Sequence, residues 1–207
     1  MTTMGETSQH SPTVFIVDDD QAIRRAMELL MRSVGLNHEI YHSGDEFLAA
    51  HSADRAGCLV LDIRMPGLGG LELQQKLIEL DSALPIIFIT GHGDVPMAVE
   101  AMQKGAVDFI QKPFRDQDLL DRIREALEMD LERRSEREEK AEVAARLDKL
   151  TKREREVMDL VVTGKPNKVI AYELGVSQRT VEIHRARVME KMGARSLADL
   201  VRMHMTA

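Results

Sequence analysis

The sequence lacks most of the features that would stabilise a small secreted domain. Cys58 is the single cysteine among 207 residues, which excludes an intrachain disulfide framework and favours a reducing compartment. Tryptophan is absent and aromatic residues make up 3%, so any core must consist mainly of aliphatic residues and methionine. Apolar runs stay below the roughly 18 residues of a membrane span, and residues 1–12 lack a signal-peptide core. We therefore expect a cytoplasmic protein whose residues 1–12 form a flexible tail.

The net charge is −7, but the two ends of the chain differ in sign. Residues 1–116 hold 17 acidic and 9 basic side chains, and residues 117–147 hold 10 and 7. Residues 148–207 instead hold 8 acidic and 12 basic side chains. An acidic first part and a basic last part predict two domains with different partners, the basic one facing a phosphate backbone.

Short apolar runs alternate with amphipathic stretches between residues 14 and 114. The four clear runs are residues 14–17, 58–61, 86–89 and 107–110, and a weaker one is residues 39–41. Each has the length of a strand, and apolar strands that alternate with helices form a parallel sheet covered on both faces. The predicted fold of residues 13–130 is therefore an α/β doubly wound, five-stranded parallel sheet. Ligand chemistry in such a sheet belongs at the carboxyl ends of the strands.

No glycine or proline interrupts residues 116–150, but the composition changes along this stretch. Apolar side chains recur at helical spacing up to Leu131, and dense mixed charge follows. Such charge is typical of a solvated helix or of a mobile linker. We expect a charged helical linker over residues 131–146. Its apolar seam lacks several consecutive heptads, so pairing of the linker with its copy stays open.

From Thr151 onward the pattern is helical throughout. Glycines at positions 164, 175 and 193 separate short amphipathic segments. The expected N-caps of four helices are Thr151 (in a capping box with Glu154), Asn167, Ser177 and Ser196. Four short helices with a tight break at Gly175 predict an all-α helix-turn-helix domain over residues 147–207.

Charged and hydroxyl side chains stand where the predicted strands end. Asp18, Asp19 and Asp20 follow the first strand, Asp62 follows the third, Thr90 ends the fourth and Lys112 ends the fifth. Crowded carboxylates repel by roughly 1 to several kcal/mol, and a hard cation such as Mg²⁺ removes that penalty. A metal, a carboxylate nucleophile, a hydroxyl group and a lysine together form a phosphoryl-transfer site. One aspartate at a strand end is commonly a turn or cap residue, but four ordered strand ends favour the site.

These motifs (residues 17–20, 62–66, 90–91 and 112–114) resemble the receiver signature of two-component response regulators. The resemblance implies a flavodoxin-like receiver fold with Asp62 as the phosphoacceptor. It implies that Asp19 is the principal Mg²⁺ carboxylate, that Asp18 assists through the metal's water shell, and that Asp62 and the backbone carbonyl of Arg64 are further ligands. It also implies that Thr90 and Lys112 stabilise the phosphoryl group and that Thr90 and Phe109 form a switch. Residues 89–102 resemble the FixJ-type subgroup, and His92 among them is expected to be structural.

The basic C-terminal part resembles the LuxR/NarL-type helix-turn-helix over residues 147–203, through the motifs at 150–157, 167–171 and 177–184. The charge pattern of residues 177–192 alone fits a recognition helix or a solvated surface helix, with Gln178, Arg179, Glu182, Arg185 and Lys191 projecting outward. The resemblance implies that Glu182, Ile183 and Arg185 face bases. It further implies that Arg179, Thr180, His184 and Lys191 contact the DNA backbone or support the helix, and that Lys168 reaches phosphate.

Together the two parts predict a transcriptional regulator, not an enzyme, that a sensor histidine kinase phosphorylates on Asp62. Its expected partners are double-stranded promoter DNA and a second copy of the chain on phosphorylation, with RNA polymerase as a further candidate and no membrane. The expected dimer surface comprises Val95, Met97, Met102, Lys104 and Asp108. A metal-dependent aspartyl-phosphate phosphohydrolase is the first rival, but residues 1–116 hold no substrate-cap insertion. A ligand-sensing regulator is the second, and it would need an apolar pocket domain instead of clustered aspartates.

Overall fold

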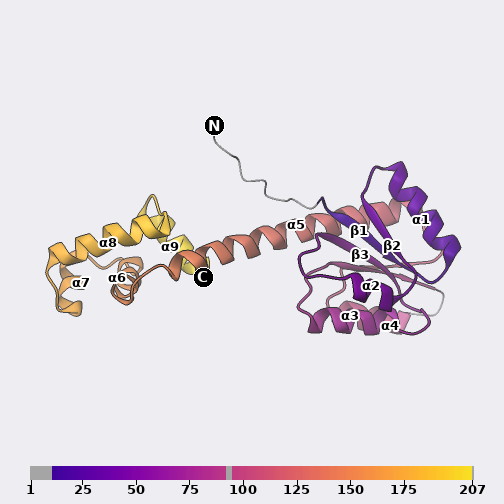
Figure 1. Cartoon of the computed structure of the whole chain (residues 1–207), viewed down its shortest axis with the longest axis horizontal. Helices are drawn as coiled ribbons and strands as arrows, with labels where there is room; N and C mark the ends of the chain where they lie inside the picture. Colours follow the sequence, from indigo (N-terminus) through magenta and orange to yellow (C-terminus); the bar gives the residue numbers. More distant parts are fainter. Residues whose placement is uncertain (1–10, 92–94, 207) are drawn as a thin grey trace. The chain divides into compact units, whose positions relative to one another are not determined.

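The computed structural model describes residues 11–91 and 95–206, and the chain divides into two compact units at Arg133 and Arg134 (Figure 1). The first unit contains, in order, β1 (Thr13–Val17), α1 (Gln21–Ser33), β2 (His38–Tyr41), α2 (Gly44–Ala50), β3 (Gly57–Asp62), α3 (Gly70–Glu79), β4 (Ile86–Thr90), α4 (Val95–Gln103) and β5 (Asp108–Gln111). Helix α5 (Asp116–Leu147) includes the boundary between the units. The second unit continues with α6 (Lys152–Val162), α7 (Asn167–Leu174), α8 (Gln178–Met192) and α9 (Leu197–Thr206).

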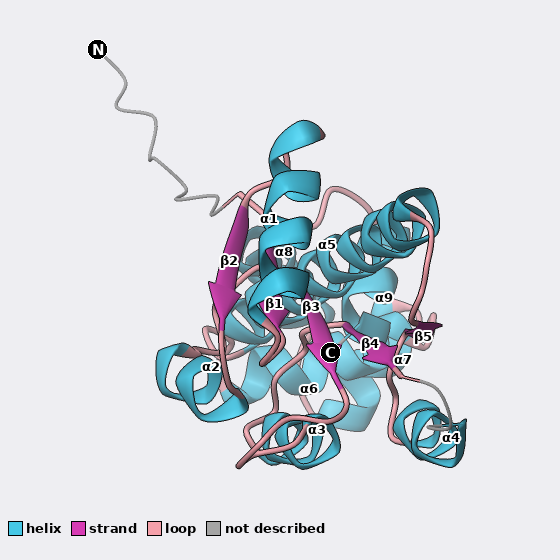
Figure 2. Ribbon diagram, turned by 90° about the vertical axis from the view of Figure 1, so that its right-hand side faces the viewer, coloured by secondary structure: helices cyan, strands magenta, loops and turns pink. Residues whose placement is uncertain are grey.

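The first unit is built on a parallel sheet with strand order β2-β1-β3-β4-β5, which confirms the predicted doubly wound fold (Figure 2). Side chains of a strand alternate between the two faces of a sheet. Phe15 and Val17 accordingly pack with α2, α3 and α4 on one face, whereas Val14 and Ile16 pack with α1 and α5 on the other. Because both faces are covered, the central strands have to be apolar throughout. The strand order places the carboxyl ends of β1 and β3 side by side.

Helix α5 is fixed to the first unit by apolar packing and by one buried carboxylate. Leu119, Ile123 and Ala126 are fully buried against the sheet. Asp130 is 2% exposed, and its Oδ2 accepts a hydrogen bond of 2.8 Å from the backbone N–H of Gly57 at the start of β3. The charged residues 131–146 continue the same helix.

In the second unit, α6 to α9 and the last turns of α5 enclose one aliphatic core. The capping box of Thr151 and Glu154 and the N-cap of Ser177 are present as predicted, and Ser196 accepts from the backbone N–H of Asp199. The prediction for Asn167 is wrong. Pro166 occupies the N-cap of α7, and the Asn167 side chain is turned to Arg185 of α8 instead.

No helix in the described part of the chain has both the length and the apolar character needed to cross a membrane.

Candidate functional site

A lysine joins two aspartates at the carboxyl edge of the sheet. The Nζ of Lys112 donates to Asp62 Oδ1 and to Asp18 Oδ2, each at 2.9 Å, although the three residues lie far apart in the sequence. Asp18 is 1% exposed and Asp62 is 8% exposed. The topology explains why the three residues meet. Strands β1, β3 and β5 belong to one parallel sheet, so their carboxyl ends, which Asp18, Asp62 and Lys112 end or follow, lie at the same edge. Three of the predicted site residues are therefore in direct contact.

The environment of Asp62 shifts its acidity in two opposing directions. Burial raises the pKa of the Asp62 carboxyl, and the nearby charge of Asp18 raises it further. The hydrogen bond from Lys112 and that from the Arg64 backbone N–H (3.1 Å to Oδ2) work against this rise, but the pKa stays above its usual value. Burial disfavours the charged form of Lys112, yet its bonds to Asp62 and Asp18 raise the pKa of the ammonium. A cation placed between two carboxylates offsets their mutual repulsion.

The remaining predicted metal ligands lie at the same edge. Asp19 is exposed and follows Asp18 directly, and both Asp19 and Arg64 line one pocket. Within the described residues, no three His, Cys, Asp or Glu side chains come together as a ready-made metal cage. Mg²⁺ keeps several of its waters and is usually held by one or two carboxylates, so it does not need such a cage. The hard oxygens of Asp18, Asp19 and Asp62 therefore fit this ion.

Thr90 lies at the end of β4, beside the end of β3. Its side chain is 3% exposed, and its Oγ1 donates to the carbonyl of Gly91 at 2.9 Å. Phe109 on the neighbouring strand β5 is 39% exposed, so its ring faces outward in this conformation. His92 lies outside the described residues.

The residues of the predicted dimer surface lie on different parts of α4 and β5. Val99 and Met102 of α4 are 49% and 39% exposed, and Phe109 of β5 is 39% exposed. Val95 begins α4, and Asp108 begins β5 and pairs with Arg122 of α5 at 2.7 Å.

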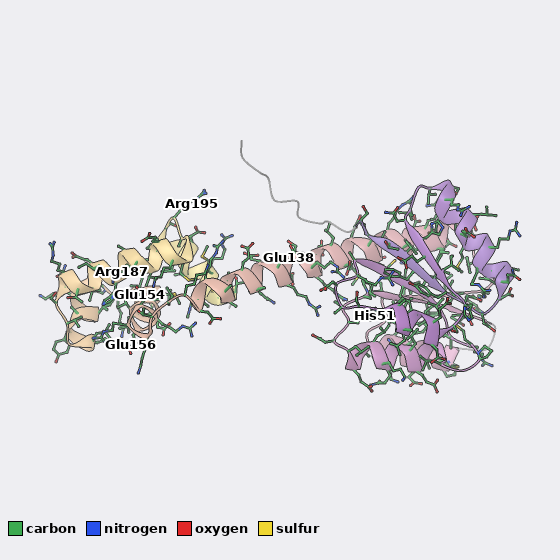
Figure 3. The ribbon with its side chains drawn as sticks, viewed as in Figure 1. His51, Glu138, Glu154, Glu156, Arg187 and Arg195 are labelled. Carbon is green, nitrogen blue, oxygen red and sulfur yellow. The ribbon has the colours of Figure 1, made fainter. Side chains whose placement is uncertain are left out.

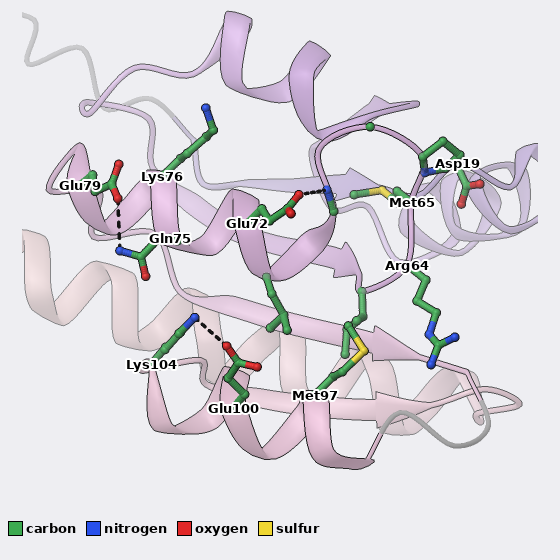
Figure 4. Close-up of a pocket in the computed structure, with 15 residues that line it drawn as sticks. Asp19, Arg64, Met65, Glu72, Gln75, Lys76, Glu79, Met97, Glu100 and Lys104 are labelled. Carbon is green, nitrogen blue, oxygen red and sulfur yellow. Dashed lines mark hydrogen bonds and ion pairs between the residues drawn. The ribbon is translucent and has the colours of Figure 1, made fainter.

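Two further residues of that prediction lie elsewhere. Met97 and Lys104 line the same pocket as Asp19 and Arg64. This pocket extends between α3 and α4 and has a volume of about 1040 Å³ (Figure 4). Met97 packs against the core, and Lys104 pairs with Glu100 at 2.8 Å. Met97 and Lys104 therefore project from a different face of α4 than Met102, and the dimer surface stays a prediction.

Helix α8 has one buried and one exposed face. Val181, Val188 and Met192 are buried in the core of the second unit. The exposed residues are Gln178, Arg179, Glu182, Ile183, Ala186, Arg187 and Glu190, whereas Thr180, His184 and Arg185 are half-buried. Lys168 is exposed on α7. The exposed face is continuous over the N-terminal half of α8, where a recognition helix contacts bases.

The expectation that Lys191 projects outward is wrong. Its Nζ donates to the carboxylate of Glu154 at 2.6 Å and to the backbone carbonyl of Lys149 at 3.0 Å. Glu154 is 2% exposed, and its bonds from Lys191 and from the Thr151 backbone lower its pKa to about 2. Of the two roles expected for Lys191, this geometry favours support of the helix.

Arg187 of α8 is not among the residues predicted to bind DNA. It is exposed on α8 and has no ion pair or hydrogen-bond partner among the described residues (Figure 3). It lies four residues after Ile183, one helical turn further along the same side. Helical periodicity from Ile183 could therefore have added Arg187 to the predicted set.

The fold and the two sites define a class of protein, namely regulators in which a receiver precedes a DNA-binding domain. Residues 14–124 match the response regulator receiver domain, and residues 148–204 match the bacterial regulatory proteins of the luxR family. The chain belongs to the response regulators that combine a receiver domain with a LuxR-type DNA-binding domain. The family predicted from the motifs is thereby confirmed.

Similar proteins cover nearly the whole chain. Nodulation protein W of Bradyrhizobium diazoefficiens is 51% identical over 193 residues, which cover 93% of this chain and 85% of that protein. Transcriptional regulatory protein FixJ of Rhizobium meliloti is 48% identical over 191 residues, covering 92% and 94%. The solved structure of the response regulator StyR has a TM-score of 0.88 and 44% identity, covering 95% of this chain and 100% of that one.

Proposed function

We propose that this protein is a transcriptional regulator that is switched by phosphorylation of Asp62. The contact of Lys112 with both Asp62 and Asp18 carries the proposal, because it assembles a nucleophile and a phosphoryl-binding cation at one sheet edge. The match to receiver and LuxR-type models and the relatives named as transcriptional regulators support it. The receiver extends over residues 13–130, the charged helical linker over 131–146 and the DNA-binding domain over 147–207. The protein acts in the cytoplasm.

The chemistry is transfer of a phosphoryl group to a carboxylate. A carboxylate oxygen of Asp62 attacks the phosphorus of a phosphohistidine on a sensor kinase. The phosphorus–nitrogen bond breaks, the histidine leaves, and an acyl phosphate forms on Asp62. Lys112 then moves from the free carboxylate to the new phosphoryl oxygens, whose charge it neutralises. Asp19, Asp62 and the Arg64 carbonyl would hold Mg²⁺, with Asp18 assisting through the metal's water shell, and the ion would supply further neutralisation of the phosphoryl charge.

Thr90 and Phe109 transmit the change. A phosphoryl group on Asp62 offers acceptors that are stronger than the Gly91 carbonyl to which Thr90 now donates. Movement of Thr90 opens room on its side of the sheet, and the exposed Phe109 ring turns inward. This reshapes the surface of α4 and β5, on which Val99 and Met102 form the apolar contacts of a homodimer.

The output is binding of promoter DNA by α8. Glu182, Ile183 and Arg185 read base edges in the major groove, where Glu accepts from cytosine and Arg donates to guanine. Gln178, Arg179, Thr180 and His184 contact the backbone or support the helix, and Lys168 binds phosphate from α7. Two DNA-binding domains joined in a dimer share a high effective concentration, so a paired site is bound more tightly without new base contacts.

The test is the affinity of the full-length protein for DNA with and without beryllofluoride and Mg²⁺. We expect a gain of at least tenfold for wild type and for Asp121→Asn, a matched change of an exposed aspartate on α5. Asp62→Asn should show no gain. An equal gain in Asp62→Asn would contradict the proposal, and small-phosphoester turnover by the purified protein would favour the phosphohydrolase instead.

A further inference from the structure

One hydrogen bond joins the two helices of the helix-turn-helix motif through their side chains. The Nη1 of Arg185, on α8, donates to Oδ1 of Asn167, at the start of α7, at 3.1 Å. Both side chains are half-buried. Because Pro166 holds the N-cap position of α7, the Asn167 amide is not needed for capping. Its oxygen is therefore available to hold the guanidinium.

Arg185 differs in this respect from the other arginines of α8. Arg179 and Arg187 are exposed, and no hydrogen bond or ion pair holds either guanidinium within the described part of the chain. A free arginine loses much of its rotamer freedom when a base fixes it, and that loss weakens binding. Arg185 has already lost part of this freedom in the unbound protein.

We propose that Asn167 is a positioning residue that aims Arg185 at a guanine in the target DNA. Guanidinium carries five N–H donors in a planar fork, and the bond to Asn167 uses one of them. The remaining donors still provide the parallel pair that N7 and O6 of guanine accept in the major groove. The amide oxygen of Asn167 thus sets the plane of the fork. This inference rests on the proposed base reading by Arg185.

The experiment begins with selection from a random duplex library, using the full-length protein with beryllofluoride and Mg²⁺. Single-base variants of the selected duplex then measure discrimination at each position. For wild type we expect a guanine in each half-site, and its replacement should cost roughly 5- to 150-fold in affinity. Arg185→Ala should abolish that preference. Lys168→Ala, the matched control, should weaken the selected duplex and random DNA alike and keep the preference.

Asn167→Ala should lose most of the guanine preference while its affinity for random DNA stays within about twofold of wild type. Asn167→Asp keeps an acceptor oxygen in the same place, so it should retain the preference despite weaker overall binding near phosphates. In the double variant Asn167→Ala/Arg185→Ala, discrimination should equal that of Arg185→Ala alone. If Asn167→Ala does not fold, Asn167→Leu, of similar size without the amide, replaces it. Thermal unfolding of each variant verifies that it is folded.

The outcomes separate the positioning role from the base reading. An Asn167→Ala protein that keeps the wild-type guanine preference, while Arg185→Ala loses it, would overturn the role of Asn167 and leave base reading by Arg185 intact. An Arg185→Ala protein with the wild-type preference would overturn both. Equal loss of discrimination in Asn167→Ala and Asn167→Asp would show that an acceptor oxygen at this position does not orient Arg185, which also overturns the positioning role.

Discussion

The Nζ of Lys112 lies 2.9 Å from Oδ1 of Asp62, across a separation of 50 residues in the sequence. This ion pair locates the proposed chemistry at one point of the sheet edge, where burial raises the pKa of the Asp62 carboxyl. The carboxylate proposed to attack phosphorus therefore already faces a cation. The consequences of this arrangement can be tested one residue at a time.

Asp62→Asn should abolish incorporation of acid-labile phosphate from a small phosphodonor, because the carboxamide cannot form an acyl phosphate. Labelling with radioactive phosphodonor, followed by acid or hydroxylamine treatment, measures this directly. Asp121→Asn, which changes an exposed aspartate of the same unit, should be labelled like wild type. Labelling of Asp62→Asn at the wild-type level would mean that another residue accepts the phosphate.

Asp19→Asn should weaken Mg²⁺ binding by roughly tenfold or more, because one charged oxygen ligand is lost from a site that uses few of them. Titration calorimetry of the full-length protein measures the affinity. Asp19 is exposed, so the substitution should leave the thermal stability unchanged. Identical titration curves for Asp19→Asn and wild type would exclude Asp19 as a ligand.

Glu154→Gln should destabilise the second unit by about 1–3 kcal/mol at pH 7, since the Lys191 ammonium loses its charged partner. Hydrogen exchange of the amides in α6 and α8 measures the loss. Lys152→Gln, on the exposed first turn of α6, is the control and should have little effect.

The same ion pair makes a prediction about pH. The pKa of Glu154 is about 2 in the folded protein, against an ordinary value of 4.5. A carboxyl group whose pKa is lower in the folded than in the unfolded protein stabilises the fold at pH values above its unfolded-state pKa. This stabilisation is lost as the pH falls through the folded-state pKa. In wild type, the protection of the α6 and α8 amides against hydrogen exchange, corrected for the intrinsic exchange rate, should therefore decrease as the pH is lowered from about 5 to 2. If Glu154→Gln shows the same pH dependence as wild type, another group is responsible.

Lys168→Gln should reduce the slope of log affinity against log salt by about 0.9, because one phosphate contact is lost. Lys191→Gln should instead lower the stability of the second unit, because its ammonium supports Glu154. Lys140→Gln, an exposed change in the linker, is the control for both measurements. A salt slope that drops for Lys191→Gln but not for Lys168→Gln would reverse the two roles.

The five-stranded parallel sheet could be predicted from the sequence because buried parallel strands need uninterrupted apolar runs, such as Val14 to Val17 and Ile86 to Ile89. The meeting of Asp18, Asp62 and Lys112 followed from the same pattern, because parallel strands end at one edge. The capping box at Thr151 and Glu154 is local in sequence, so it was also predictable.

Contacts between helices were not predictable in this way. Lys191 and Glu154 are 37 residues apart, and Asn167 and Arg185 are 18 apart. Whether a long basic side chain turns outward or back onto a neighbouring helix depends on packing that single-sequence periodicity does not contain. The division of α4 into two faces has the same origin, because the helix packs on α3 at a rotation that no motif specifies.

The proposed switch is tested most directly by sedimentation velocity of wild type and Val99→Asp, each with and without beryllofluoride and Mg²⁺. Val99 is 49% exposed on α4, and Leu29→Asp, at a 60% exposed leucine of α1, is the matched control. With beryllofluoride, wild type and Leu29→Asp should shift from monomer to dimer, whereas Val99→Asp should stay monomeric with Asp62 still reactive. A wild-type protein that stays monomeric while its DNA affinity rises would contradict dimerisation as the switch and point to release of an inhibitory contact between the domains.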